Sequence, residues 1–322
     1  MKHFLITIVR LCLGACILLA SCAGSAGYTV GICQQAPHQA LDAAAQGFRD
    51  ALEAELGKGS VAFLEQNAQG ESTSCTSIIN YFVSRNADLI LASGTTALQA
   101  AVNGTGEIPI LGTAVTDFGT ALGMADFDGA TGINVSGTTD LTPLDQQAAM
   151  ILELYPKAKK VGLLYCSAEP NSDYQIKGIR THLEKAGVTC TDFAFFDSNE
   201  LAAVATAAAA ASDVIYIPTD NTAAASAEAI AGAVLDTGTP ILGGDEGICR
   251  SCGIATLCVD YYALGELTGK MAAEILRGEA DAGGMPVVGA PEFLRVYNPD
   301  ICREYGVDTA LLESLGYTPI TQ

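Results

Sequence analysis

The segments "ADLILASGTTALQAA" (residues 87–101) and "SDVIYIPTDNTAAASAEAI" (residues 212–230) follow one pattern. In each, an aspartate precedes a short apolar run, and threonine follows the run where an alanine-rich segment begins. Short apolar runs between helices are typical of parallel strands that are buried on both faces of a sheet. Each segment is therefore predicted to be a buried strand followed by a helix.

The likeness between the two halves of the chain extends to four elements in the same order. The other matched pairs are "TVGIC" at 29–33 with "KVGLLYC" at 160–166, "SVAFLEQNA" at 60–68 with "VTCTDFAFFD" at 188–197, and "IPILGTAVTD" at 108–117 with "TPILGGDE" at 239–246. Any α/β chain can show such matches by chance, but the shared "PILG" argues against chance here. The repeat predicts two similar lobes, each with a parallel sheet covered by helices.

The segment after the second repeat predicts how the lobes are joined. "YYALGELTGKMAAEILRG" at 261–278 has an apolar stripe at helical spacing, and the second lobe has no place for this helix in its own series. We expect the helix to return to the first lobe, which gives crossings near 137–139, 256–258 and 289–291. The predicted fold class is α/β, with two Rossmann-like lobes joined by a three-strand hinge.

These crossings define the predicted domains. Lobe 1 is expected to contain residues 28–137 plus about 258–289, and lobe 2 residues 138–257 plus about 290–322. A chain of 322 residues is usually too long for one small hydrophobic core, which also favours two lobes.

The composition indicates a globular protein that does not bind nucleic acid. The chain is 49% hydrophobic, and 36 acidic residues against 16 lysines and arginines give a net charge of −20. Binding to nucleic acid would require basic stripes, and the sequence shows none.

The first residues are predicted to be a targeting segment. Lys2 and Arg10 precede the apolar stretch "LCLGACILLA" at 11–20, which is too short to span a bilayer by itself, and "LASC" at 19–22 resembles a bacterial lipobox. The resemblance implies a lipoprotein signal peptide at 1–21, lipidation of Cys22 and a short tether at 22–27. The expected location is the extracytoplasmic face of a bacterial membrane, and the alternative is an ordinary secretory peptide cut nearby.

Eight cysteines follow Cys22, and most lie in or beside apolar segments. They are Cys33, Cys75, Cys166, Cys190, Cys249, Cys252, Cys258 and Cys302. Export permits disulfides, so "CRSC" at 249–252 is either a local disulfide or a pair of plain thiols. A zinc site would need a second pair or histidines at ligand spacing, so neither a metal nor a cofactor is expected.

Polar residues gather at the predicted carboxyl ends of the strands, where open parallel sheets bind their ligands. The candidate ligand-binding residues are His38, Ser93, Thr95, Thr96, Thr116 and Asp117 from the first lobe, and Glu169, Asn171, Ser172, Thr219, Asp220, Asn221 and Asp245 from the second. Hydroxyl groups at helix starts suit a carboxylate, and acids at strand ends suit an ammonium group. A free amino acid needs both.

Each candidate residue also has a structural interpretation. The threonines at 95–96 and Asn171 with Ser172 would serve as helix N-caps in any protein, and Asp117 and Asp245 would serve as turn formers. His38 either contacts the ligand or faces water. The convergence of such residues from both repeats favours a binding site.

Motifs of common enzymes are not found. The sequence has no G-x-S-x-G elbow, no P-loop and no G-x-G-x-x-G after the first strand. We therefore expect no catalytic residues and no enzymatic activity.

Over nearly its whole length after residue 27, the chain resembles the ABC-transporter solute-binding proteins of the type I periplasmic-binding fold, in the subgroup associated with tryptophan and other aromatic amino acids. The segments that carry the resemblance are "HQALDAAAQGF", "TAVTDF", "TGINVSG", "LYPKAKKVGLLYCSAEPNS", "IYIPTDNT" and "VDYYALGELTGKMAAEILRG". It implies that the positions nearest the ligand are Thr95, Thr96, Asp117, Asn171, Ser172, Asp220, Asn221 and Asp245.

The resemblance also implies a mechanism and partners. A monomeric lipoprotein would capture an aromatic amino acid between its lobes and deliver it to a membrane permease that works with an ATPase. The family usually has Glu-His-Pro where this chain has Pro37-His38-Gln39, so the ligand's side chain stays open. The alternatives are another amino acid or a nucleoside on the same fold, and a sensor or adhesion lipoprotein that does not transport.

Overall fold

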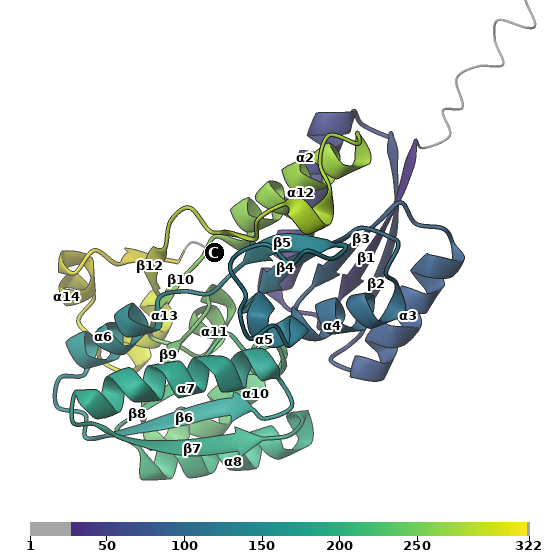
Figure 1. Cartoon of the computed structure of the whole chain (residues 1–322). Coiled ribbons are helices and arrows are strands. Elements are labelled where there is room, and N and C mark those ends of the chain that lie inside the picture. Colours follow the sequence, from purple (N-terminus) through teal and green to yellow (C-terminus); the bar gives the residue numbers. More distant parts are fainter. Residues whose placement is uncertain (1–26, 321–322) are drawn as a thin grey trace, which may run out of the picture.

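The computed structural model describes residues 27–320, which form two α/β lobes side by side (Figure 1). The predicted signal peptide, Cys22 and nearly all of the predicted tether lie outside the described residues. Within residues 27–320, no helix has the length and apolar character needed to cross a membrane.

Lobe 1 is built on a six-stranded sheet in which every pair of neighbours is parallel, with the order β11-β5-β4-β3-β1-β2. Its strands are β1 (Tyr28–Gln34), β2 (Val61–Asn67), β3 (Leu89–Ser93), β4 (Ile110–Val115), β5 (Val135–Thr139) and β11 (Val288–Gly289). Its helices are α2 (Gln39–Leu56), α3 (Ser72–Ser84), α4 (Thr95–Gly104), α5 (Phe118–Leu122) and α12 (Tyr261–Leu276), with a 3₁₀ turn at Ala282–Gly284.

Lobe 2 is built on a seven-stranded sheet with the order β13-β12-β10-β9-β8-β6-β7. Its strands are β6 (Lys160–Cys166), β7 (Thr189–Phe195), β8 (Val214–Ile217), β9 (Ile241–Gly243), β10 (Ala255–Cys258), β12 (Leu294–Tyr297) and β13 (Thr318–Pro319). Its helices are α6 (Leu144–Leu154), α7 (Pro170–Lys185), α8 (Ser198–Ala211), α9 (Asn221–Ala225), α10 (Ala227–Val234), α11 (Glu246–Ser251), α13 (Pro299–Glu304) and α14 (Thr309–Ser314), with a 3₁₀ turn at Leu235–Thr237.

One pairing in the lobe 2 sheet is antiparallel, so β12 and its parallel neighbour β13 run opposite to the other five strands. β12 runs antiparallel to β10, because the chain reaches β12 by crossing back from β11 in lobe 1. The chain passes between the two sheets three times, through residues 140–143, 259–260 and 290–293.

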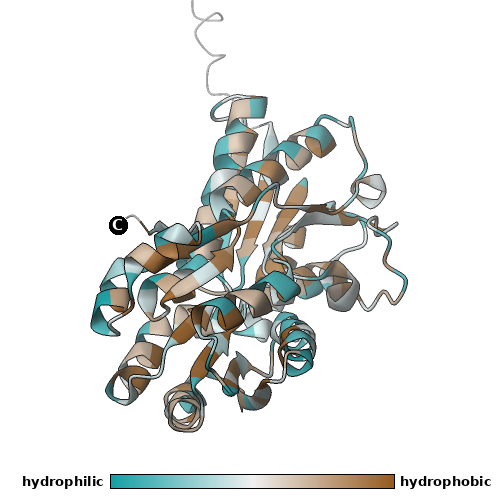
Figure 2. Cartoon of the chain, turned by 90° about the vertical axis from the view of Figure 1, so that its left-hand side faces the viewer, coloured by the Kyte–Doolittle hydropathy of each residue, from teal (hydrophilic) through white to brown (hydrophobic). Residues whose placement is uncertain are grey.

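The cores lie between the sheets and their helices, and each lobe has its own. Figure 2 shows the hydrophobic colour concentrated in the strands and the hydrophilic colour on the outward faces of the helices. The strands β3 and β4 are buried along their whole length, as expected for parallel strands covered on both faces.

Helix α12 lies against α2 on one face of the lobe 1 sheet (Figure 1). The two backbones meet at glycines: an added Cβ at Gly265 would stand 2.0 Å from the Ala44 carbonyl oxygen, and one at Gly47 would stand 2.1 Å from the Tyr262 carbonyl oxygen. The axis of α12 is therefore held against lobe 1 by backbone contact.

All eight described cysteines are free thiols, and all but the half-buried Cys190 are buried. Cys249 and Cys252 both lie in the interior of lobe 2. Among residues 27–320, no three histidine, cysteine or acidic side chains stand together as a metal site would require.

Candidate ligand-binding site

The strand ends of the two lobes face each other, and the lobes are in contact there. Helix α5 of lobe 1 lies against α7 of lobe 2, and α2 lies against α11. A hydrogen bond between the lobes joins His38 Nε2 and Asn221 Oδ1 at 3.1 Å. The structure therefore shows the lobes closed over the residues between them.

The turn from β3 into α4 is covered by a side chain that we did not predict there. Gly94 is the N-cap, with φ of 100°, and the N–H of Thr96 donates to Gln35 Oε1 at 2.9 Å. An added Cβ at Gly94 would stand 2.6 Å from the same oxygen. Thr95 and Thr96 are therefore not N-caps, and Gln35 accepts from a backbone N–H group at the helix start where we expected a carboxylate of the ligand.

In lobe 2, Glu169 organises the start of α9. It accepts hydrogen bonds from Asn221 Nδ2 (2.7 Å), from Thr222 Oγ1 (2.7 Å) and from two backbone N–H groups. Its oxygens are thus occupied by protein donors. This arrangement makes Glu169 a group that positions Asn221, the residue that reaches His38.

Asp220 and its neighbours form a second buried network. Asp220 caps α9 and accepts from Ser172 Oγ at 2.8 Å and from the N–H of Cys166 at 2.6 Å. Asn171 Nδ2 donates to the carbonyl oxygen of the half-buried Thr219 at 3.1 Å. Asn171 and Ser172 lie in the first turn of α7, whose N-cap is Glu169, so they are not the N-caps of the alternative interpretation.

Three polar atoms at this interface are buried and have no hydrogen-bond partner within the protein. They are His38 Nδ1, Ser93 Oγ and Asn171 Oδ1. Ser93 and Asn171 are buried almost completely and come from opposite lobes. Buried polar groups are nearly always hydrogen-bonded, so these three atoms are groups at the interface that a polar ligand could satisfy.

Two buried carboxyl groups lie near the crossings. Asp140, in the first crossing, is 2% exposed and accepts from Thr116 Oγ1 at 3.1 Å and from Tyr261 OH at 2.9 Å. Asp245 is 1% exposed and caps α11 through the N–H of Ile248 at 2.9 Å. Among the described residues neither forms an ion pair with a lysine or arginine, so both acids are available to a cation.

The electrostatics follow from this burial. Burial raises the pKa of Asp140 to about 6, and the nearby Asp245 adds to the effect. Burial also raises the pKa of Asp245, although the nearby His38 opposes it, and burial with the charge of Glu169 raises that of Asp220 to about 7. An ammonium group bound beside Asp140 and Asp245 would lower the pKa of both.

These shifts predict how pH acts on the ligand-free protein. The folded carboxyl groups hold their protons at higher pH than the unfolded ones, whose pKa is near 3.8, so this stabilising contribution is present below about pH 4 and is lost as pH rises through about 6 to 7. We expect the melting temperature to rise by a few degrees when pH falls from about 7.5 to about 5.5, and to rise less in Asp140→Asn. A melting temperature that stays constant or falls as the pH is lowered over this range would contradict the raised pKa values of these buried acids.

The remaining predicted residues lie at the edge of this cluster. Asp117 is half-buried and caps α5 through the N–H of Thr120, and its charge contributes to raising the pKa of Tyr174 on α7.

A groove of about 370 Å³ opens between the lobes; its lining includes Gln35, Gln69, Thr96, Glu169, Phe196 and Thr222. Neither Asp140 nor Asp245 lines this groove, so it is separate from the buried acids.

The sequence interpretation missed Gln35, Asp140 and Tyr261. Asp140 follows the end of β5, so the strand-end rule that selected Asp117 could have selected it. Tyr261 was predicted only as part of a helix that packs on lobe 1. It donates to Asp140 because the first and second crossings lie side by side, and the sequence does not show this. Gln35 carries no signal in the sequence, because its contact with α4 depends on the loop after β1.

Two α/β lobes joined by three crossings, closed over buried polar groups at facing strand ends, are the architecture of a two-lobed ligand-binding protein. Residues 29–315 match the ABC transporter substrate binding protein family, and the chain belongs to this family. The family resemblance and the predicted fold class, the type I periplasmic-binding fold, are thereby confirmed. Proteins of this family are extracytoplasmic and in general are not enzymes.

Several relatives cover most of the chain. A tyrosine-binding protein of Clostridioides difficile strain R20291 is 33% identical over 290 residues, which are 89% of this chain and 84% of the relative. A Streptococcus pneumoniae ABC domain in complex with L-tryptophan is 29% identical, with a TM-score of 0.85 over 91% of this chain and 99% of that one.

A third relative differs in the state of its lobes. The ligand-free, open structure of a substrate-binding protein with adhesive properties from Clostridium difficile is 33% identical, with a TM-score of 0.67 over 91% of this chain and 100% of that one. The lower TM-score at higher identity agrees with the contact between the lobes seen here: this structure is closer to the L-tryptophan complex than to the open form.

Proposed function

We propose that this protein captures a free aromatic amino acid between its lobes and delivers it to an ABC importer. The observation that carries the proposal is the pair of buried acids, Asp140 and Asp245, neither of which forms an ion pair with a lysine or arginine among the described residues. The ammonium group of an amino acid would supply the missing charge. The similarity to a tyrosine-binding protein and to an L-tryptophan complex supports an aromatic side chain.

The ligand's carboxylate would lie at Ser93 Oγ, the hydroxyl donor among the three unpartnered polar atoms at the interface. Ser93 Oγ donates a hydrogen bond in any rotamer that faces an acceptor. His38 Nε2 donates to Asn221 Oδ1, so Nδ1 of the neutral ring is an acceptor and would face a donor of the ligand. His38 also joins Asn221 of the other lobe, so a ligand held at His38 would favour the closed form. Thr95, Thr96, Thr116, Asp117, Ser172 and Thr219 would form the wall around it.

The export and docking steps belong to the same proposal. Lipidation of Cys22, supported by "LASC" at 19–22, would anchor the protein at the outer face of the cell membrane. The closed form would then dock on a permease that works with an ATPase.

The absence of tryptophan from the sequence gives a direct test. Bound L-tryptophan would be the only indole in the sample, so we expect its emission to shift and to saturate with a Kd in the micromolar range or tighter. A ligand at about 100 times its Kd adds about 2.7 kcal/mol to the free energy of unfolding, so the melting temperature should also rise. If none of L-tryptophan, L-tyrosine and L-phenylalanine raises it, the proposed ligand class is wrong, and a nucleoside and other amino acids become the next ligands to test.

A further inference from the structure

Gln147 is a completely buried side chain that joins segments far apart in the sequence. It lies in the first turns of α6, just after the first crossing. Its Nε2 is within hydrogen-bonding distance of Thr142 Oγ1 (2.5 Å), of the Leu257 carbonyl oxygen (3.1 Å) and of the Gly244 carbonyl oxygen (3.4 Å). Its Oε1 accepts from the hydroxyl group of Tyr216.

The partners of Gln147 share a position relative to the site. Thr142 lies within the first crossing, Leu257 is in β10 just before the second crossing, and Gly244 precedes Asp245. A single amide therefore ties two crossings to the loop that carries one of the buried acids.

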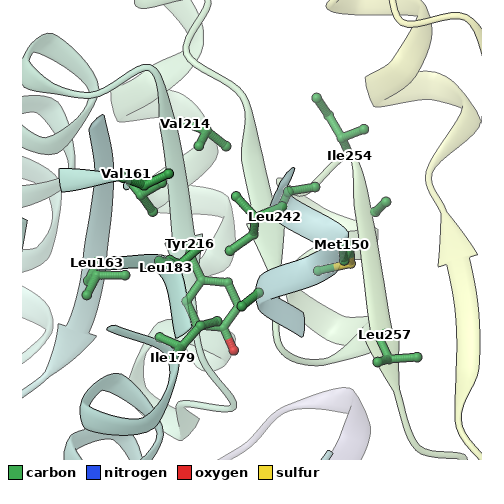
Figure 3. Close-up of a cluster of buried hydrophobic side chains, with 14 of the residues drawn as sticks. Met150, Val161, Leu163, Ile179, Leu183, Val214, Tyr216, Leu242, Ile254 and Leu257 are labelled. Carbon is green, nitrogen blue, oxygen red and sulfur yellow. The ribbon is translucent and has the colours of Figure 1, made fainter. Parts of the chain in front are cut away.

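Tyr216 fixes the direction of that amide. Its ring lies in the lobe 2 core beside Leu163, Ile179 and Leu183, and the hydroxyl oxygen is the only polar heavy atom of the side chain (Figure 3). Because the hydroxyl group donates to Oε1, the Nε2 end must face the crossings. The rigid core of lobe 2 thus sets the position of both crossings.

Lobe 1 holds its side of the crossings with a different network. The hydroxyl groups of Thr113 (β4), Thr138 (β5) and Thr268 (α12) lie 2.8–3.2 Å from one another, and all three residues are completely buried. The first crossing is thus fixed at Thr138 on one side and at Thr142 on the other. Asp140 lies between these two anchors.

We propose that Gln147 is a positioning residue that fixes the lobe 2 side of the hinge, so that closure brings Asp140 and Asp245 to one defined separation. The link to binding rests on the proposed function, because the ligand's ammonium group is what the two acids would hold. The role of Gln147 in the hinge does not rest on the proposed function, since it depends only on the contacts of Gln147.

The test compares Gln147→Met with two other variants. Methionine keeps the length of glutamine and removes every hydrogen bond, so we expect L-tryptophan to bind about tenfold more weakly, mainly through faster dissociation. Tyr216→Phe keeps the donors of Gln147 and removes only the hydrogen bond that orients them, so its loss of affinity should be smaller than that of Gln147→Met. Thr239→Val is the matched control, because it removes a buried lobe 2 hydrogen bond to the Ala209 carbonyl oxygen at the opposite end of β9.

Two readouts separate the possible outcomes. If Gln147→Met and Thr239→Val lower the melting temperature alike and neither changes the Kd, Gln147 is only structural and the proposal is overturned. A second measurement uses spin labels on non-natural amino acids at the exposed positions 80 and 202, one in each lobe. Gln147→Met should broaden the distribution of distances between the lobes, and an unchanged distribution overturns the hinge role even if the wild-type protein binds no amino acid.

Discussion

Asp140→Asn is expected to weaken the binding of the aromatic amino acid by 100-fold or more while leaving the ligand-free protein as stable as the wild type, or more stable. Removing one partner of a buried ion pair costs about 3–5 kcal/mol, and every 1.4 kcal/mol is tenfold in Kd. Thr116 Oγ1 donates to one oxygen of Asp140 and Tyr261 OH donates to the other. Asparagine keeps one of these acceptors and replaces the other by an NH2 donor, so one hydroxyl group can still donate and the other must turn to accept. The ligand-free form also loses a buried charge that has no cationic partner among the described residues.

Titration by indole emission and thermal unfolding without ligand measure the two effects separately. Asp245→Asn should act in the same direction, because asparagine can still cap α11. Asp213→Asn is the control: that carboxyl group accepts from the N–H groups of Lys159 and Lys160 at the far end of the lobe 2 sheet, so its loss should affect stability and not Kd.

A ligand analogue identifies the group that Asp140 holds. Indole-3-propionate has the ring and the carboxylate of tryptophan but lacks the ammonium group. It should bind the wild type weakly and should lose no further affinity in Asp140→Asn. If the variant weakens the analogue as much as it weakens L-tryptophan, Asp140 shapes the site and does not bind the ammonium group.

The fold could be predicted because its signal is local and occurs twice. A short apolar run such as "LILAS", bounded by turn residues, is typical of a strand covered on both faces. The repeat of strand, helix and "PILG" in the same order then predicts the second lobe from the first. The direction of β12 could not be read in this way. It depends on which sheet the chain leaves before residue 294, and no residue of the strand itself records that.

The site was predictable as a region and less so as a set of roles. The strand-end rule places Asp220 and Asp245 at the interface, and the structure buries both there. Other contacts at the site, however, join distant segments. The carboxylate of Glu169 accepts hydrogen bonds from the first residues of α9, and Gln35 accepts from the start of α4. Such contacts depend on how two loops meet across a sheet edge, which composition and spacing do not encode.

The largest effect on stability is expected from Gly265→Ala, at the contact of α12 with α2. An added Cβ would stand 2.0 Å from the backbone carbonyl oxygen of Ala44, and a backbone atom cannot move aside as a side chain can. The helices would have to separate, which we expect to lower the free energy of unfolding by about 3 kcal/mol and the melting temperature by roughly 6–12 °C.

Gly232→Ala is the matched control, because Gly232 lies in α10 and an added Cβ there would meet nothing within 4 Å. That change should raise stability by about 0.5–1 kcal/mol through helix propensity. If the two substitutions have equal effects, α12 and α2 are not in close backbone contact.

Gly265→Ala should also weaken ligand binding at temperatures where it stays folded, because α12 begins at Tyr261, whose hydroxyl group holds Asp140 in place. The packing of one helix on lobe 1 therefore sets the position of an acid at the centre of the proposed site.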